Sequence, residues 1–182
     1  MRVIAGKARG IQLQTPKGML TRPTTDRVKE ALFSILQFEL PGAKVLDLFG
    51  GTGQLGIEAL SRGASRAVFV DSRREACQLI RSNLKKTHLE QDAMVIQRDY
   101  MDYLNQCHEQ FRLILLDPPY AEVFLENSIK RITEIDILQS NGIIATERPL
   151  GKELPWEFPG FTRSKDYKYG QILLTFYRKN EE

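Results

Sequence analysis

The stretch VLDLFGGTGQLG, residues 45–56, is the strongest indication of the fold of this chain. Its glycines, Gly51, Gly53 and Gly56, match G-x-G-x-x-G, a fingerprint of dinucleotide-binding loops, and Asp71 follows at about the spacing of a ribose-binding carboxylate. Taken literally, the pattern predicts an NAD-dependent dehydrogenase. Asp47, however, ends the strand directly before the glycines, where a negatively charged pyrophosphate would have to pass. The ligand of this loop therefore has to be argued from its surroundings.

Outward from this loop, strand-like and helix-like segments alternate. Apolar, β-branched strands separated by helices are typical of a parallel sheet with both faces covered. The chain instead ends with two strand-like segments and no helix between them, with Gly170 near the turn, which predicts an antiparallel hairpin at one edge. A dinucleotide fold would repeat its βαβαβ half, so this ending argues against a dehydrogenase. Expected strands are residues 44–49, 66–71, 93–99, 111–117, 141–148, 160–170 and 171–179, and expected helices are residues 55–63, 74–86, 100–107 and 122–132.

The segment before residue 26 differs from the rest. Two short strand-like pieces, residues 2–6 and 10–14, predict a hairpin, and a Pro-, Gly- and Thr-rich loop follows. Next comes an amphipathic helix with one apolar face. We therefore divide the chain into a basic N-terminal hairpin and loop, residues 1–25, and an α/β domain, residues 26–182. The apolar face of the helix consists of Val28, Leu32, Ile35 and Leu36.

Composition narrows the functional classes. The 182 residues, 42% hydrophobic and 27% charged, suit one globular domain. Cys77 and Cys107 are too few and too far apart for a disulfide framework, which favours a reducing compartment. His88 and His108 lack metal-ligand spacing, so we expect no metal site. The sequence offers no membrane-length apolar run and no signal-peptide core, and we expect a cytoplasmic protein.

Carboxylates at the strand ends point to the ligand. Asp47, Asp71, Asp99 and Asp117 each end or follow a predicted parallel strand, where open α/β sheets bind ligands. Such a setting is poor for a diphosphate but suits S-adenosylmethionine, which offers ribose hydroxyls, an ammonium and a sulfonium. Asp71 would accept the hydroxyls, Asp47 would lie near the ammonium and Asp99 would meet the adenine amino group. For each aspartate, a helix cap or a turn residue is the alternative.

The stretch LILLDPPYAE, residues 113–122, supplies the chemistry. Two prolines stiffen the turn and remove two N–H donors, which leaves the Asp117 carboxylate and the Pro118 carbonyl as acceptors. An exocyclic amino group on a base needs such acceptors, because its lone pair is otherwise delocalised into the ring. A ring such as Tyr120 would stack on the base. We therefore expect Asp117, Pro118, Pro119 and Tyr120 to form the catalytic box of a methyltransferase.

Three stretches together carry a family resemblance: DLFGGTGQLGIEALSRGA (47–64), LDPPY (116–120) and RPTTDRVKEALF (22–33). With them the chain resembles the bacterial 16S rRNA guanine-N2 methyltransferases (RsmD-like) over nearly its whole length. The resemblance implies a class I, Rossmann-like fold with a seven-stranded, mostly parallel sheet, helices on both faces and a C-terminal antiparallel hairpin. It also implies S-adenosylmethionine as methyl donor and S-adenosylhomocysteine as product. The cofactor positions carried over are Asp47, Phe49, Gly51, Gly53, Asp71 and Asp99.

The expected partner is 16S rRNA in an assembled or partly assembled small ribosomal subunit, bound by a monomer away from any membrane. Residues 1–30 hold seven basic and two acidic residues, a local charge of +5 in a chain of net charge +3. A basic arm of this kind is typical of a surface that meets a polyanion. If the arm lies beside the cofactor, its cations would hold RNA phosphates while the target base is unstacked. The cations predicted for this role are Lys7, Arg9, Lys17, Arg22 and Arg27.

Two alternatives to a guanine-N2 enzyme remain open from sequence. Adenine-N6 DNA and RNA methyltransferases share the DPPY box, so the box does not identify the base. A nucleotide-binding scaffold without catalysis would keep the glycine loop, although the intact box argues against it.

Overall fold

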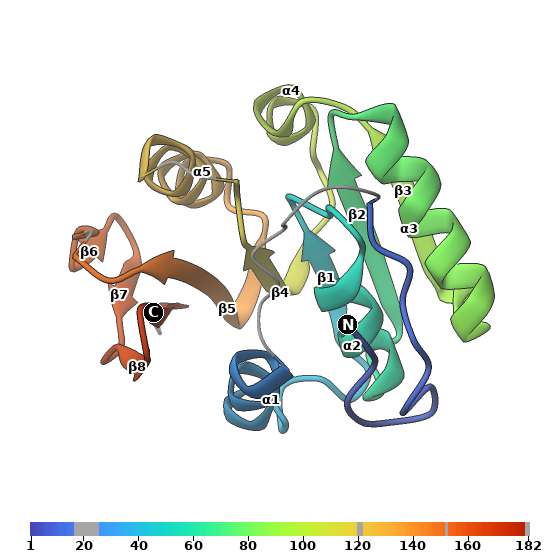
Figure 1. The fold of residues 1–182 in the computed structure, drawn as a ribbon. Coiled ribbons are helices and arrows are strands. Elements are labelled where there is room, and N and C mark those ends of the chain that lie inside the picture. Colours follow the sequence, from blue (N-terminus) through green and yellow to red (C-terminus); the bar gives the residue numbers. More distant parts are fainter. Residues whose placement is uncertain (17–25, 120–121, 152, 181–182) are drawn as a thin grey trace.

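The computed structural model describes residues 1–16, 26–119, 122–151 and 153–180. They form a single mixed sheet with helices on both faces, as predicted (Figure 1). Nine strands are present in these ranges, in the order β3-β2-β1-β4-β5-β9-β7-β6, with β8 also paired to β9. None of the helices in the described ranges is long and apolar enough to cross a membrane.

The parallel part of the sheet is the frame on which the site is built. Strands β3, β2, β1, β4 and β5 all run in one direction, so their carboxyl ends meet at one edge. Strands β1, β2 and β4 and the middle of β5 are buried on both faces, which explains their apolar runs, whereas β3 lies at the edge and is more exposed. Their bounds are β1 Lys44–Asp47, β2 Arg66–Asp71, β3 Ala93–Gln97, β4 Phe111–Leu116 and β5 Leu138–Pro149.

The C-terminal strands confirm the predicted antiparallel edge but divide it differently. Strand β9 (Ile172–Lys179) pairs antiparallel with β5 on one side. On its other side the single strand expected over 160–170 is broken into β7 (Phe161–Arg163) and β8 (Tyr167–Tyr169). The break coincides with Asp166, whose carboxylate accepts hydrogen bonds from Arg148, Arg163 and Thr175 instead of facing outward. A further short strand, β6 (Glu157–Phe158), pairs with β7, so the seven expected strands become nine.

Helices cover the sheet in two layers (Figure 1). One core cluster joins α1, α2 and α3 to one face, and the second joins α4 and α5 to the other. The expected helices are all present, and α1 buries Val28 and Leu32 as its apolar spacing predicted. Their bounds are α1 Asp26–Ile35, α2 Gln54–Ser61, α3 Arg74–Thr87, α4 Tyr100–Asn105 and α5 Glu122–Ile135, with a short 3-10 turn at Glu90–Asp92.

The predicted N-terminal hairpin is present, although it forms a single antiparallel bridge, Arg2 to Gln12, rather than two full strands. Backbone hydrogen bonds between residues 1–3 and 10–13 hold it closed. Its apolar side chains, Val3, Ala8 and Leu13, lie in the same core cluster as α1 and α2.

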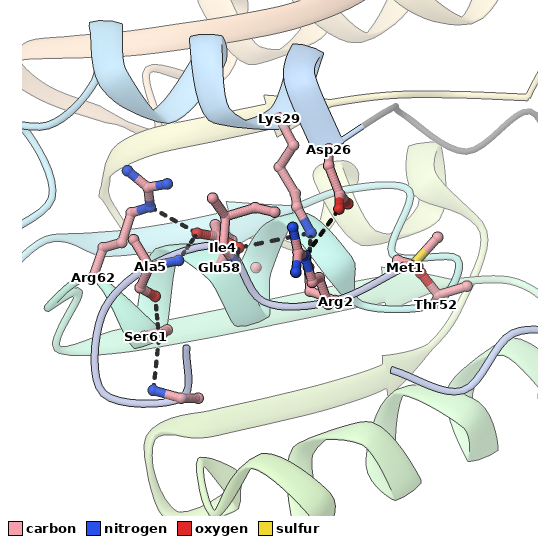
Figure 2. Close-up of polar contacts among 12 residues, drawn as sticks. Met1, Arg2, Ile4, Ala5, Asp26, Lys29, Thr52, Glu58, Ser61 and Arg62 are labelled. Carbon is pink, nitrogen blue, oxygen red and sulfur yellow. Dashed lines mark hydrogen bonds and ion pairs between the residues drawn. The ribbon is translucent and has the colours of Figure 1, made fainter. Parts of the chain in front are cut away.

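A buried carboxylate fixes this hairpin to the sheet-covering helices. Glu58 of α2 is fully buried and accepts the backbone N–H groups of Ile4 and Ala5 at 2.8 and 3.0 Å and the Arg62 Nε at 2.7 Å (Figure 2). Its Oε2 lies 3.7 Å from Nζ of Lys29, a fully buried lysine of α1 that also donates to the Arg2 carbonyl. Burial lowers the pKa of Lys29, although the charge of Glu58 opposes this shift. Apolar periodicity does not reveal such a network, because it treats charged residues as exposed.

Candidate active site

A cavity of about 610 Å³ opens at the carboxyl ends of β1, β2, β4 and β5. This volume lies in the range that holds a small molecule of cofactor size. Residues from the β1–α2 loop, the ends of β2 and β3, the turn after β4 and the end of β5 all line it. The four predicted aspartates, Asp47, Asp71, Asp99 and Asp117, are therefore brought together as the strand pattern predicted.

The glycine loop forms one wall. Gly51 lines the cavity with φ of +56°, a left-handed conformation that favours glycine, and Phe49 and Gly50 lie beside it. Gly56 has another function, because a Cβ there would lie 2.2 Å from the Phe69 ring, so the glycine allows α2 to pack closely on β2. Gly53, predicted as a cofactor contact, is not among the lining residues. It is the N-cap of α2, and its φ of +81° makes the turn.

Asp47 lines the cavity beside the glycine loop and is 1% exposed to solvent. Its Oδ2 accepts the Gly56 backbone N–H at 3.1 Å. Burial raises the pKa of this carboxyl to about 7; the Gly56 hydrogen bond opposes the increase and the charge of Asp71 adds to it. A group that changes charge near neutral pH inside a cavity is a candidate functional residue.

Asp71 is fully engaged in this structure. Its Oδ2 accepts the Gly51 N–H at 2.9 Å, which ties the glycine loop to the end of β2. Both oxygens also accept from Arg73, through the backbone N–H at 2.9 Å and through Nε and Nη2 at 3.1 and 3.2 Å. The Arg73 side chain is about half exposed, so its guanidinium can leave without being extracted from a core. Ribose hydroxyls could take its place on Asp71.

A cluster of three aromatic rings also lines the cavity. Phe49, Tyr100 and Phe124 lie with ring centroids 5.2 to 6.2 Å apart, and all three line the cavity. Rings arranged in this way offer stacking surfaces for a purine. Asp99 also lines the cavity, but its Oδ1 accepts the backbone N–H groups of Met101 and Asp102 and caps α4. The helix-cap alternative for Asp99 is thus present, and its second oxygen is not used in that cap.

The proline turn forms another part of the cavity lining. Asp117, Pro118 and Pro119 follow β4 and line the cavity, and Tyr120 of the predicted box lies outside the described residues. Next to this turn, the end of β5 contributes further residues to the cavity lining that the sequence motifs did not identify. They are Glu147, Arg148 and Pro149, with Ile172 of β9 beside them. The sequence feature that could have identified them is the charged pair Glu147 and Arg148 at the carboxyl end of an apolar strand.

Two of the basic residues predicted to bind RNA lie away from the cavity. Lys7 donates its backbone N–H to Ser61 at the end of α2, and its Nζ lies 3.3 Å from Asp92, which precedes β3. Lys7 and the exposed Arg9 of the same turn are therefore at the amino end of the strands, away from the cavity. Only the first residue of the hairpin, Met1, lines the cavity, where its sulfur accepts from the Thr52 hydroxyl.

Of the other three residues predicted to contact RNA, one lies near the cavity and two lie outside the described residues. Arg27 is exposed on α1, next to Asp26, which pairs with Arg2, the neighbour of Met1. Lys17 and Arg22 fall outside the described residues. Tyr167 and Tyr169 of β8 are partly buried and pack against the core.

Comparison with known proteins identifies methyltransferases as similar to this chain. A protein family described as "Conserved hypothetical protein 95" matches residues 1–178. The chain is 39% identical to "Putative rRNA methyltransferase YlbH" of Bacillus subtilis over 182 residues, covering 98% of this chain and 99% of that protein. It is 31% identical over 182 residues to "Ribosomal RNA small subunit methyltransferase D" of Escherichia coli, covering 100% and 91%. A solved structure, "Putative methyltransferase yhhF from Escherichia coli", matches with a TM-score of 0.90 at 30% identity, covering 100% and 99%.

Proposed function

Because the chain belongs to the family described as Conserved hypothetical protein 95 and is similar to the ribosomal RNA small subunit methyltransferase D of Escherichia coli, we propose that it is an rRNA methyltransferase of the cytoplasm. Its reaction moves a methyl group from S-adenosylmethionine to the exocyclic N2 of a guanine in 16S rRNA. The observation that carries this proposal is the shared cavity: Asp71, Asp47 and the Asp117–Pro118 turn line it from the adjacent strands β2, β1 and β4, so the donor would lie over β2 and β1 and the acceptor beside β4.

The donor end suits a ligand with a cationic tail. Asp71 would accept the ribose hydroxyls after they displace the Arg73 guanidinium, while the Gly51 N–H keeps the carboxylate in place. Asp47 would face the ammonium group, and Phe49 and Tyr100 would pack on the adenine. A pyrophosphate would instead meet two carboxylates, which opposes the dehydrogenase interpretation.

The acceptor end suits an amino group on a flat ring. The Asp117 carboxylate and the Pro118 carbonyl would accept the two N2–H bonds, which directs the nitrogen lone pair at the donor methyl. In the transfer the sulfur–carbon bond breaks, a nitrogen–carbon bond forms, the sulfonium becomes a neutral thioether and the nitrogen then loses a proton. Positive charge develops on that nitrogen before the proton leaves, and the Asp117 carboxylate stabilises it.

Mass mapping of 16S rRNA from a deletion strain tests the assignment directly. The deletion is expected to remove one N2-methylguanine, and the plasmid-borne gene is expected to restore it. Loss of an N6-methyladenine instead would show that the target base is adenine. An unchanged modification map would overturn the substrate assignment.

Replacing Asp71 by asparagine is expected to weaken S-adenosylmethionine binding by about 100-fold, because hydrogen bonds to the two ribose hydroxyls would lose their charge assistance. Calorimetry measures the dissociation constant. Asp92→Asn is the matched control, because Asp92 lies at the amino end of the strands and pairs only at the surface with Lys7. NAD should bind neither the parent protein nor the variants; measurable NAD binding would favour the dehydrogenase interpretation.

Asp47 predicts a pH dependence of donor binding. Its pKa of about 7 means that the donor-free protein holds a neutral carboxyl below that pH and a carboxylate above it. A cationic donor binds the carboxylate better, so its affinity should increase as the pH rises from 6 to 8, by up to about tenfold per unit. The affinity of Asp47→Asn, measured over the same pH range, shows how much of the change comes from titration of the ligand itself. Parallel curves for the two proteins would contradict the role of Asp47.

A further inference from the structure

The carboxylate of Asp71 already accepts as many hydrogen bonds as a carboxylate can hold. Its Oδ1 accepts the Arg73 backbone N–H at 2.9 Å and the Arg73 Nε at 3.1 Å. Its Oδ2 accepts the Gly51 backbone N–H at 2.9 Å and the Arg73 Nη2 at 3.2 Å. The two oxygens of an ionised carboxylate offer about four acceptor sites, and these bonds occupy all of them. Ribose hydroxyls can therefore bind Asp71 only after one of the present donors has left.

The two bonds from the Arg73 side chain are the ones that can be given up. The Arg73 side chain is 52% exposed and the Asp71 side chain is 7% exposed, so the guanidinium can turn into solvent while the carboxylate stays in the cavity wall. The other two donors are backbone N–H groups, held by the β1–α2 loop and by the turn between β2 and α3. One of them binds each oxygen, so the carboxylate keeps its orientation when the guanidinium leaves.

The guanidinium and a ribose would compete for the same acceptor sites on Asp71. Arg73 lines the cavity together with Asp71, and both of its side-chain bonds go to the oxygens that ribose hydroxyls would use. A ligand that binds only one of two states loses affinity in proportion to the population of that state. The state in which the Arg73 side chain holds both oxygens cannot accept the hydroxyls, so its population lowers the affinity for any ligand that binds through them.

We propose that Arg73 is an autoinhibitory residue of the donor site: its guanidinium occupies Asp71 in the donor-free protein and must be displaced by the ribose. This inference rests on the proposed function, since it assumes that the ribose of an S-adenosyl ligand binds Asp71. The donor and the product carry the same ribose, so Arg73 weakens the binding of both. Weaker product binding favours the release of S-adenosylhomocysteine after each transfer, and the freed carboxylate then pairs with Arg73 again.

Calorimetric titration with S-adenosylhomocysteine tests the proposal. This ligand carries the ribose but lacks the sulfonium charge, so repulsion between Arg73 and a sulfonium does not contribute. Arg73→Ala is expected to bind it about 3- to 10-fold more tightly than the parent protein does, because a bidentate, half-exposed ion pair no longer has to be broken. The direction of the change is decisive, since loss of a residue that holds the ligand or orients Asp71 would weaken binding instead.

Two variants control for charge and for geometry. Arg74→Ala removes the same charge from the next residue, which is exposed and does not line the cavity. Its affinity should stay within about twofold of the parent value, because solvent screens an exposed charge that has no contact with the ligand. Arg73→Lys keeps the charge but cannot bind both oxygens as a fork, so its affinity should fall between those of the parent and Arg73→Ala.

An analogue without ribose hydroxyls separates displacement from any other effect of Arg73. The 2′,3′-dideoxy form of S-adenosylhomocysteine has no hydroxyl that could replace the guanidinium on Asp71. Its affinity should therefore be nearly the same for the parent protein and for Arg73→Ala. The gain in affinity seen with the hydroxylated ligand is expected to disappear.

The outcomes distinguish this proposal from the assigned function. If the parent protein binds S-adenosylhomocysteine but Arg73→Ala binds it equally well or more weakly, the autoinhibitory role is overturned and the function stands. The role is also overturned, with the function intact, if Arg74→Ala gains as much affinity as Arg73→Ala or if the dideoxy analogue shows the same gain. If neither S-adenosylmethionine nor S-adenosylhomocysteine binds the parent protein, the assigned function itself fails.

Discussion

Replacing Asp117 by alanine is expected to lower the rate of methyl transfer by about 100- to 1000-fold, the loss typical when one group that stabilises transition-state charge is removed. Asp117 would accept a hydrogen bond from the guanine N2 amino group and would stabilise the positive charge that develops on that nitrogen. Donor affinity should change little, because Asp117 follows β4 and would contact the acceptor base, whereas Asp71 at the end of β2 would hold the donor. Single-turnover kinetics at saturating donor measure the rate, and calorimetry measures the affinity.

The matched control for this variant is Asp102→Ala. Asp102 is an exposed aspartate of α4 that does not line the cavity, so its replacement should leave the rate within about twofold of the parent. A rate for Asp117→Ala close to that of the parent enzyme would remove Asp117 from the catalytic role. Donor binding without any turnover in the parent protein would instead favour the non-catalytic scaffold.

Replacing Glu58 by alanine is expected to lower the free energy of unfolding by about 3–5 kcal/mol, because it breaks a buried ion pair and leaves one partner charged. The buried Lys29 would lose its counter-charge, and the backbone N–H groups of Ile4 and Ala5 would lose their acceptor. Urea unfolding at neutral pH measures the change. The loss should appear in the midpoint with little change in the slope, since the folded core is otherwise the same.

Two further variants show whether the loss comes from the buried network. Glu30→Ala removes an exposed carboxylate of α1 and should change the free energy of unfolding by less than about 0.5 kcal/mol. Combining Glu58→Leu with Lys29→Met removes both buried charges and should be less destabilising than Glu58→Ala. A loss below about 1 kcal/mol for Glu58→Ala would show that the network contributes little to the stability of the fold.

Local patterns were sufficient for most of the fold. The continuous apolar runs of β1, β2 and β4 and the spacing of Val28 and Leu32 in α1 confirm the predicted α/β arrangement. The carboxyl ends of parallel strands meet at one edge of a sheet, so the sequence also placed the four strand-end aspartates together. Periodicity did not foresee the split of the strand over 160–170, because the bonds of Asp166 join residues far apart in the chain.

The candidate site could likewise be predicted from the sequence only in part. The glycine loop and the proline turn are short motifs, and their backbone constraints follow from the residues themselves. Gly53 shows the limit of that interpretation, since its positive φ makes the turn while the cavity wall is formed by its neighbours Gly50 and Gly51. The pairing of Asp71 with Arg73, two residues away, also went unrecognised, because side-chain direction at a strand end depends on the fold.

The order of strands and helices, the positions of the strand-end aspartates and the two motifs that indicate a methyl donor and an amino acceptor all follow from local features of the sequence. They do so because they depend on side-chain periodicity and on backbone restrictions within a few residues. Three other facts depend on the folded chain: Glu58 and Lys29 meet in the interior, Lys7 lies away from the cavity, and Glu147 lies beside Asp117. These facts depend on sheet register and helix packing, which bring together residues separated by tens of positions in the chain.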